Sequence, residues 1–326
     1  MPVHAVEKPL GLTSHGAVAR ARRLLGTRRV GHAGTLDPLA GGVLVLLSGE
    51  ATKLSPFVAA GRKAYLAWVA FGLGTPTLDA EPPAAGADLA HSEPGPLAAL
   101  TAEAVRAQAS RFLAVTSQRP PAFSAVKQAG QRSYAAARRG SATEPPARPV
   151  AYHDVELLAF AERRDALPAT FARGPGGWGS ARAGAGRSFD LPPELAPLPT
   201  ALFRLEVAAG TYIRSFARDL GAALDAPAHL SGLVRVAAGG IDLTRCCPLD
   251  DIATAPPLDP VEALPLPRLR LDAAAAAAVR QGKRPELVPA GPTVLLDDEG
   301  AVAAVVEPGS SGRARILRVW QRGLTP

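Results

Sequence analysis

Apolar positions in this 326-residue chain form two patterns that are typical of strands. Continuous apolar runs at 43–47 and 64–71 predict strands that are buried on both faces. The segment 203–207 alternates apolar and polar residues, which predicts a strand with one exposed face. We therefore expect a sheet whose central strands are covered on both sides.

Helical spacing follows several capping signals. Ser14 precedes an apolar stripe, which predicts a helix that it caps and that ends near Leu25, before Gly26. Two further helices are expected over 101–115 and 215–224. Helices and strands that alternate in this way predict a mixed α/β architecture.

Segments rich in proline, glycine and alanine divide the chain. We expect a loop at 80–98, a flexible insertion at 161–200 and a linker at 255–267. After the linker come a short alanine-rich helix and the β-type runs 292–296 and 301–306. The pattern predicts a large domain, 1–254, and a small β-rich domain, 268–326.

The charge of the chain indicates what class of partner it binds. The chain has a formal net charge of +7 and a pI near 9.9, and 47% of its residues are hydrophobic. Residues 1–63 hold nine basic and three acidic side chains, and residues 118–149 hold six and one. Basic clusters of this kind favour a nucleic acid or another polyanion. No apolar span or basic amphipathic helix predicts a membrane partner.

The two cysteines add little chemistry. Cys246 and Cys247 are adjacent, so a relaxed disulfide between them is not expected, and two thiols alone make a poor metal site. The chain starts without the apolar segment of a signal peptide. We expect a protein of the reducing cytoplasm.

One acidic residue stands out in the basic N-terminal region. Asp37 lies in the glycine-rich run Gly-His-Ala-Gly-Thr-Leu-Asp-Pro at 31–38, directly before the buried strand 43–47. Asp-Pro with nearby glycines is also a common turn, so the motif alone leaves both interpretations open. A carboxylate at the mouth of a buried strand is well placed to act on a ligand.

Five separated motifs together resemble the bacterial tRNA pseudouridine synthases of the TruB type. They are Lys-Pro-Leu-Gly-Leu-Thr-Ser at 8–14, the Asp37 run continuing to Gly42, Lys-Ala-Tyr at 63–65, Arg-Pro-Pro-Ala-Phe-Ser-Ala-Val-Lys at 119–127 with Gly130 and Tyr134, and Gly-Thr-Tyr-Ile-Arg at 210–214. The likeness covers nearly the whole chain apart from 161–200. It departs from the family at Glu7, where Asp is usual, and at Leu-Val-Arg 233–235, where Leu-Arg-Arg is usual.

The resemblance implies a fold and an activity. The fold would be an α/β (α+β) pseudouridine-synthase-like catalytic domain, 1–254, around a mixed, largely antiparallel sheet, with an RNA-gripping segment at about 118–149. Residues 268–326 would form a small PUA-like RNA-binding β-barrel. The activity would be isomerisation of uridine to pseudouridine at position 55, in the T-arm loop of tRNA. No cofactor or metal would be needed, and the enzyme would act as a monomer.

The resemblance also implies three catalytic residues. Asp37 would be the nucleophile, and the Arg214 guanidinium would keep its carboxylate ionised. Tyr65 would stack on the uracil, and its phenol is the candidate that removes the proton at carbon 5. Without the resemblance, Tyr65 would be a core tyrosine and Arg214 a surface arginine.

Five further residues are expected to bind substrate. His32 would fill the space left by the everted nucleotide or contact its phosphate, while Tyr212 and Leu233 would line the pocket. Lys8 and Lys127 are candidates for phosphate contacts. Further candidates for such contacts are Arg20, Arg23, Arg132 and Arg138.

Three alternatives stay open at this point. A guide-RNA-dependent pseudouridine synthase shares the aspartate loop, but the basic segment 118–148 favours a stand-alone enzyme. A non-catalytic RNA-binding module has only the charge and the PUA-like tail in its favour. A metal-dependent hydrolase is disfavoured because the six histidines show no ligand spacing.

Overall fold

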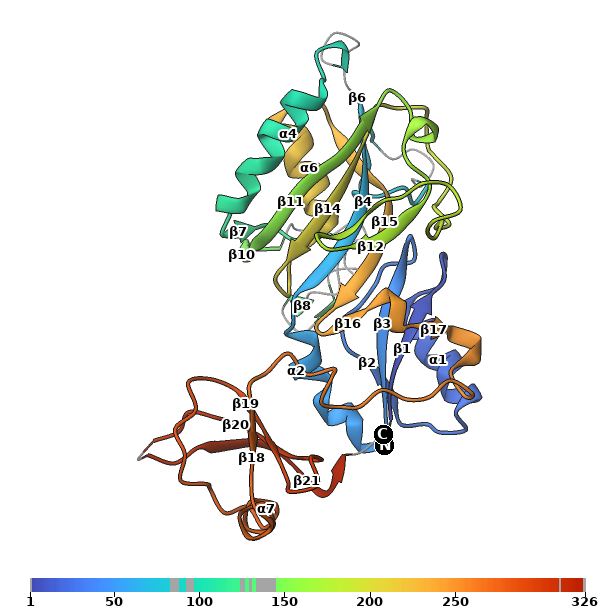
Figure 1. Ribbon diagram of the computed structural model, residues 1–326. Helices are drawn as coiled ribbons and strands as arrows, with labels where there is room; N and C mark the ends of the chain where they lie inside the picture. Colours follow the sequence, from blue (N-terminus) through green and yellow to red (C-terminus); the bar gives the residue numbers. More distant parts are fainter. Residues whose placement is uncertain are drawn as a thin grey trace.

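A nine-stranded mixed sheet forms the centre of the molecule (Figure 1). The computed structural model describes residues 2–82, 88–91, 97–123, 127–128, 131–132, 145–310 and 312–324. Within them the sheet has the order β11–β14–β4–β15–β3–β1–β17, with β16 paired to β15 and β2 paired to β3. Its strands are β1 (Val3–Lys8), β2 (Val30–His32), β3 (Ala40–Ser48), β4 (Lys63–Phe71), β11 (Tyr152–Ala161), β14 (Thr200–Val207), β15 (Ala228–Ala238), β16 (Ile241–Asp242) and β17 (Cys247–Pro248).

The pairing confirms the predicted mixed, largely antiparallel sheet. Among the described strands, β15 runs parallel to β3 and β1 runs parallel to β17, and the other pairs of this sheet are antiparallel. The apolar runs at 43–47 and 64–71 lie in β3 and β4, which are buried on both faces. The parallel β15–β3 pair brings residues from distant parts of the chain together at the middle of the sheet.

Helices pack on the central sheet and on a smaller C-terminal sheet. They are α1 (Ser14–Leu24), α2 (Ser55–Ala59), α4 (Ala102–Ser110), α6 (Ile213–Ala223) and α7 (Ala273–Arg280), with 3-10 turns at η1 (Gly49–Leu54), η2 (Arg111–Ala114), η3 (Arg164–Ala166), η4 (Leu243–Arg245) and η5 (Leu249–Asp251). Phe216 of α6 packs on Phe112 and on Phe203 of β14, with ring centroids 4.7 and 5.3 Å apart. In the described part of the chain, no helix is both long and apolar enough to cross a membrane.

The first helix differs from its prediction in one informative way. Its N-cap is Thr13, whose hydroxyl accepts a hydrogen bond from the Gly16 amide. Ser14 is the first helical residue and is buried. Its hydroxyl donates to the Leu36 carbonyl (3.0 Å) and accepts from the Leu36 amide (2.8 Å). The polar side chain expected to cap the helix therefore anchors the loop that carries Asp37.

The structure corrects the prediction of a flexible insertion at 161–200. This segment forms the hairpin of β12 (Phe171–Gly174) and β13 (Gly177–Ser180). Phe171 and Trp178 are buried in the main core, and Phe171 packs edge-to-face on Trp68 of β4. Glycines and arginines dominate the composition of this segment and led to the prediction of flexibility. Two aromatic residues, Phe171 and Trp178, nevertheless fix the hairpin to the sheet.

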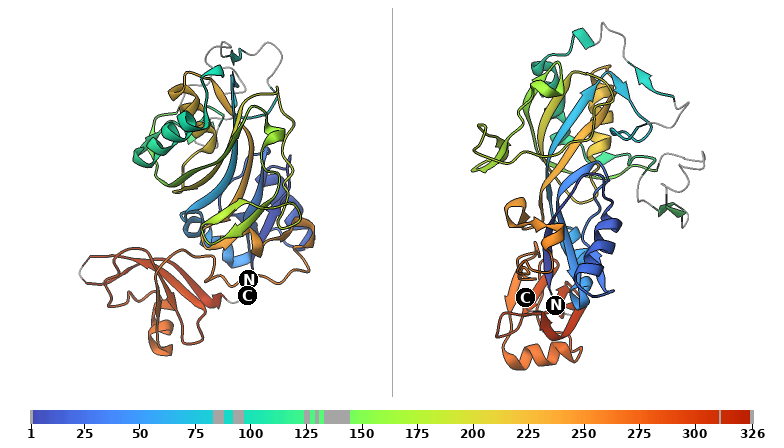
Figure 2. Two further views of the ribbon diagram at one scale, coloured as in Figure 1. Left: turned by 45° about the horizontal axis from the view of Figure 1, so that its top comes forward. Right: turned by 90° about the vertical axis from the view of Figure 1, so that its right-hand side faces the viewer.

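A four-stranded sheet forms the C-terminal part, as the β-type runs predicted (Figure 2). Its strands are β18 (Arg268–Arg270), β19 (Thr293–Leu296), β20 (Val302–Glu307) and β21 (Arg315–Leu324), and α7 packs beside it. Trp320 is buried, and its indole N–H donates to the Glu50 carbonyl of η1 (3.2 Å). The 255–267 linker is irregular, yet Leu258 and Val261 are buried in the main core. The assignment of residues 268–326 as a PUA-like barrel stays a prediction.

Short strands complete the described structure. They form three two-stranded ladders, β5 with β6, β7 with β10 and β8 with β9. Their bounds are β5 (Leu73–Gly74), β6 (Ala90–His91), β7 (Ser117–Gln118), β8 (Lys127–Gln128), β9 (Gln131–Arg132) and β10 (Arg148–Pro149). The ladder of β7 and β10 pairs the two ends of the segment 118–149, which is expected to grip RNA.

Candidate active site

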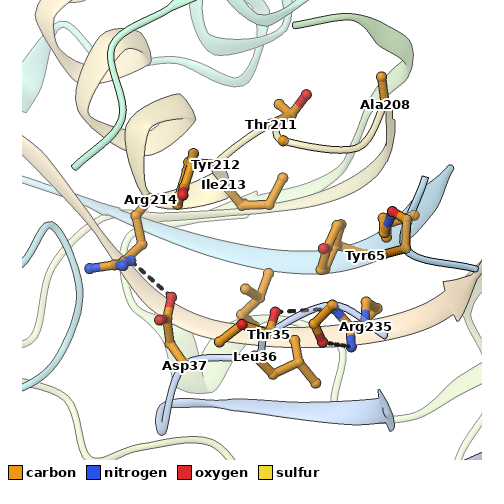
Figure 3. Close-up of a pocket in the computed structure, with 15 residues that line it drawn as sticks. Thr35, Leu36, Asp37, Tyr65, Ala208, Thr211, Tyr212, Ile213, Arg214 and Arg235 are labelled. Atoms are coloured by element: carbon orange, nitrogen blue, oxygen red, sulfur yellow. Dashed lines mark hydrogen bonds and ion pairs between the residues drawn. The ribbon is translucent and has the colours of Figure 1, made fainter. Parts of the chain in front are cut away.

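A cavity of about 240 Å³ lies over the middle of the central sheet (Figure 3). It is lined by the loop 34–37, by Ala59 at the end of α2, by the turn and helix start 208–214, and by residues of β4 and β15. The strand residues are Lys63, Tyr65, Leu233 and Arg235. The parallel pairing of β15 with β3 brings the loop before β3 over these side chains. The volume is slightly below the roughly 300–1,000 Å³ of drug-sized ligand pockets, which suits a single flat ring.

Asp37 and Arg214 meet in this cavity, as Figure 3 shows. The Arg214 Nε lies 3.0 Å from the Asp37 Oδ2, and the arginine side chain is 6% exposed while the aspartate side chain is 36% exposed. The Nε–H has no aligned hydrogen-bond partner among the described residues, so charge attraction holds the pair. The carboxylate is thus kept beside a cation while one side stays open to a ligand.

Arg214 also pairs with a second carboxylate that the motifs did not indicate. The Nη1 atom lies 3.6 Å from Asp79 Oδ2 and donates to the Thr77 carbonyl (2.8 Å). Asp79 is 3% exposed and accepts from the Thr77 hydroxyl (2.7 Å) and the Glu81 amide (3.0 Å). Burial raises the pKa of the Asp79 carboxyl above its ordinary value, and Arg214 opposes that rise. Asp79 therefore pairs with a different nitrogen of the guanidinium from the one that faces Asp37.

Arg235 supports the Asp37 loop from below. Its guanidinium is 1% exposed and donates to the carbonyls of Val43 (2.8 Å), Gly34 (3.1 Å) and Thr35 (3.3 Å). Gly34 has a φ of +100°, a conformation that suits glycine and turns its carbonyl toward the guanidinium. In the described part of the chain, no carboxylate lies within ion-pair distance of Arg235. Backbone dipoles of the loop therefore solvate this buried charge.

Lys63 forms another part of the cavity wall. It is 7% exposed, and its ammonium donates to the carbonyls of Ala59 and Gly61. Burial, together with the smaller effect of the nearby Arg235 charge, lowers the pKa of Lys63 to about 8. Lys63 and Arg235 are thus two neighbouring cations in the wall of the cavity that Asp37 also lines.

Lys8 is not placed to contact a phosphate, contrary to the prediction. It is 1% exposed, and its ammonium donates to the carbonyls of Pro9 (2.9 Å) and Leu12 (2.5 Å). Burial lowers the pKa of Lys8 to about 8, with Asp37 opposing that effect. A lysine whose donors serve its own turn supports the fold beneath the Asp37 loop and cannot reach a surface ligand.

The aromatic and apolar residues predicted for the pocket do lie in its wall. Tyr65 is 7% exposed on β4, and Leu233 is 6% exposed on β15. Tyr212 lines the cavity from the turn before α6. The structure therefore brings Asp37, Arg214 and Tyr65 together with both residues expected to line the pocket.

His32 lies outside the cavity wall. It ends β2, packs edge-to-face on His15 with ring centroids 5.8 Å apart, and has a buried Nδ1 atom that lacks a partner among the described residues. Burial lowers the pKa of the His32 imidazole, so the ring is neutral at neutral pH. Its place is beside the Asp37 loop.

The remaining basic candidates are only partly described. Arg20 forms an ion pair with Asp250 (2.6 Å), and Arg23 is exposed near the end of α1. Lys127 belongs to β8 and Arg132 to β9, but their side chains, and the whole of Arg138, lie outside the described residues. Their contacts with a ligand stay predictions.

Comparisons with known proteins give one consistent family. Residues 22–174 match the model of the N-terminal domain of the TruB family of pseudouridylate synthases. The chain is 46% identical over 320 residues to a protein named tRNA pseudouridine synthase B from Deinococcus deserti, covering 98% of this chain and all of that protein. It is 43% identical to a protein of the same name from Thermus thermophilus, covering 99% of each.

Solved structures show the same fold at low sequence identity. The chain superposes on a crystal structure of a Cbf5–Nop10–Gar1 complex with a TM-score of 0.66 and 20% identity, covering 98% of this chain and 84% of that one. An archaeal box H/ACA Nop10–Cbf5 complex gives a TM-score of 0.62 and 18% identity. At this identity the likeness extends to the fold alone.

Proposed function

The chain belongs to the TruB family of pseudouridylate synthases, and on that premise we propose that it converts uridine to pseudouridine at position 55 in the T-arm loop of tRNA. Isomerisation of uridine in tRNA follows from its relatives, which carry the name tRNA pseudouridine synthase B. The position of the uridine and the roles of individual residues are the proposal.

One observation carries the proposal: Asp37, Arg214 and Tyr65 line a single cavity, although they lie far apart in the sequence. Pseudouridine formation breaks the bond from ribose to the uracil nitrogen, rotates the base and joins the ribose to carbon 5. The atoms of the product are those of the substrate. The site must therefore supply a nucleophile, room to hold the base, and a group that takes the carbon 5 proton.

Asp37 is proposed as the nucleophile. Its carboxylate attacks either the ribose carbon 1 or the uracil ring, and the covalent intermediate divides one difficult step into easier ones. Arg214 pairs with the Asp37 carboxylate and holds it toward the cavity. Because about a third of the Asp37 side chain is exposed, an everted nucleotide can reach it.

The strand residues are proposed to hold the loose base. Tyr65 stacks on the uracil ring, and Leu233 and Tyr212 close the pocket. The Tyr65 phenol is the candidate that removes the carbon 5 proton after the base is rejoined, which is feasible because that intermediate is acidic. If Asp37 is bonded to ribose carbon 1, its carboxylate leaves as carbon 5 forms the new bond to that carbon; if it is bonded to the uracil ring, it leaves when the ring double bond re-forms. Either way Asp37 is regenerated unchanged.

The rest of the proposal concerns the RNA. Eversion of a loop uridine leaves a gap, and the neutral ring of His32 beside the Asp37 loop is suited to fill it. The basic segment 118–149 contacts the T-arm, with Lys127 among its phosphate contacts. We place the enzyme in the cytoplasm, as a monomer with tRNA as its partner.

The test uses an unmodified tRNA transcript and a minimal T-arm stem-loop. The wild-type protein is expected to form pseudouridine at position 55 in both, as located by chemical mapping. Asp37→Asn should abolish turnover while tRNA still binds, because the amide keeps the shape of the carboxylate but is a poor nucleophile. Asp165→Asn, which removes the same charge from an exposed carboxylate on η3, should retain full activity.

Two results would contradict the proposal. Appreciable turnover by Asp37→Asn would remove Asp37 as the nucleophile. Modification of another uridine, with position 55 left unchanged, would overturn the assigned substrate position while leaving the family intact.

A further inference from the structure

A buried amide outside the cavity holds the residue from which α6 starts. Gln118 lies in β7 and is 4% exposed. Its Oε1 accepts from the Tyr212 amide (2.9 Å), and its Nε2 donates to the Tyr212 carbonyl (3.2 Å). One side chain thus pairs with both backbone polar groups of a single residue, as a neighbouring antiparallel strand would.

The orientation of this amide is fixed by its surroundings. The Gln118 Nε2 also donates to the Tyr152 hydroxyl (2.7 Å). A flipped amide would set its N–H groups against the Tyr212 N–H and its oxygen against the Tyr212 carbonyl. Tyr152 is itself 5% exposed and packs on Phe112 and Phe216. The amide is therefore held rigidly, with its oxygen and both of its N–H groups in use.

Tyr212 lies where α6 begins. It is the N-cap residue of α6, with φ −102° and ψ 117°, so the placement of its backbone sets where the helix starts. Arg214 follows two residues later, so a rotation of the helix start would carry its guanidinium away from Asp37.

The start of α6 also contacts the first residues of the segment 118–149. The Arg119 carbonyl accepts from the Ser215 hydroxyl (2.8 Å) and from Arg218 (3.0 Å). The Phe123 carbonyl accepts from Arg214 Nη2 (2.9 Å). The first turns of α6 and the first residues of this segment are therefore one connected unit.

We propose that Gln118 is a positioning residue for the reaction, which holds the backbone of Tyr212 so that Arg214 meets Asp37 in the orientation the chemistry requires. This inference rests on the proposed function, because it assigns Arg214 and Asp37 their roles. Gln118 acts through Tyr212 and touches neither the substrate nor the reacting atoms. Gln118 is also the first residue of the segment 118–149, so it links the placement of Arg214 to the segment expected to grip RNA.

The test compares Gln118→Met with the control Tyr152→Phe in the full-length protein. Gln118→Met removes both bonds to Tyr212, and Tyr152→Phe removes only the third partner of the amide. Gln118→Met should lower the single-turnover rate on unmodified tRNA roughly 10- to 100-fold, as for a misplacement of about 1 Å. Its Kd for tRNA and its melting temperature should match those of Tyr152→Phe, whose rate should stay near that of the wild type.

A second variant tests the inference by pH. In Gln118→Glu the buried carboxyl has a raised pKa, so the acid form, which still donates one hydrogen bond, persists at low pH. Its rate relative to the wild type should fall as the pH rises from about 6 to about 8, because the carboxylate repels the Tyr212 carbonyl. This variant decides the question if Gln118→Met fails to fold.

Three results would overturn the inference: a wild-type rate in Gln118→Met, an equal loss in Tyr152→Phe, or a pH-independent ratio for Gln118→Glu. A rate loss that lies entirely in tRNA affinity would also overturn it. Failure of the proposed function is distinguishable, since it would leave the wild-type protein itself without pseudouridine at position 55.

Discussion

At the scale of single residues, the motifs predicted which side chains meet in the cavity more reliably than how the surrounding side chains are placed. Asp37 and Arg214 lie 3.0 Å apart, as the family motif implied. Lys8 belongs to an equally clear motif, yet its ammonium bonds the Pro9 and Leu12 carbonyls and is buried. A motif states that a residue type is present, whereas the direction of a long flexible side chain depends on the local fold.

Arg235 offers a test of how strictly the Asp37 loop is held. Arg235→Lys replaces a fork of donors by one ammonium, which cannot reach three carbonyls at once. We expect the single-turnover rate to fall roughly 10- to 100-fold with little change in tRNA affinity, because the loop shifts while the RNA surface does not.

The control for Arg235 is Arg164→Lys. Arg164 also donates to a carbonyl of β15, that of Ser231, but lies away from the cavity. Its substitution should leave the rate unchanged. A full rate in Arg235→Lys would show that the loop keeps its geometry without the guanidinium.

Lys8 predicts a pH dependence of stability. Its pKa is about 8 in the native state, against an ordinary value of 10.5. Between these values the unfolded chain binds more protons than the native state, so the contribution of Lys8 to the free energy of unfolding rises with pH. The full change is at most about 3 kcal/mol, at about 1.4 kcal/mol for each unit of pKa.

Urea denaturation of the wild type and of Lys8→Met at about pH 7 and about pH 10 measures this change, because the other titrating groups cancel in the comparison. The wild type should gain stability relative to Lys8→Met at the higher pH. A difference that is constant or falls with pH would contradict the native pKa. Lys8→Met should leave tRNA affinity unaltered if Lys8 has only its structural role.

At the scale of elements, periodicity predicted the type of each long segment, and side-chain contacts decided its ends. The helix predicted to start at Ser215 starts at Ile213, because the bonds at Tyr212 fix the first turn. The helix expected over 101–115 ends as α4 at Ser110 and continues as the 3-10 turn η2. Composition was a poor guide at 161–200, where two buried aromatic side chains outweigh many glycines.

The hairpin of β12 and β13 should contribute to stability as a packed element. Trp178 is 3% exposed and donates to the Asp242 carboxylate (3.0 Å). Trp178→Ala should lower the free energy of unfolding by roughly 3–5 kcal/mol, as for other large aromatic residues truncated in cores. Arg182→Ala, an exposed change in the same segment, should alter it by less than about 0.5 kcal/mol. An equally small effect of Trp178→Ala in chemical denaturation would restore the flexible-insertion hypothesis.

At the scale of the whole molecule, net charge predicts how binding responds to salt. With +7 overall, the protein should bind tRNA with an affinity that falls steeply as salt rises, since each phosphate contact releases bound counterions. Arg23→Gln should reduce the slope of log Kd against log salt by about 1 if Arg23 contacts a phosphate. Arg163→Gln removes an equal charge that is already paired with Asp165, so it should leave the slope unchanged. Identical slopes for all three proteins in filter binding would remove Arg23 from the interface.

The sequence by itself determined the classes of element, the basic character of the chain and, through the family motifs, the residues that we propose to react. These properties depend on local periodicity, on composition and on short ordered patterns. Only the tertiary structure decided that Asp79, Arg235 and Gln118 serve the site, because their contacts join residues separated by many positions in the chain. A hydrogen bond to a backbone carbonyl depends on folded geometry and leaves no pattern in the sequence, so the supporting residues become visible only once the sheet is assembled.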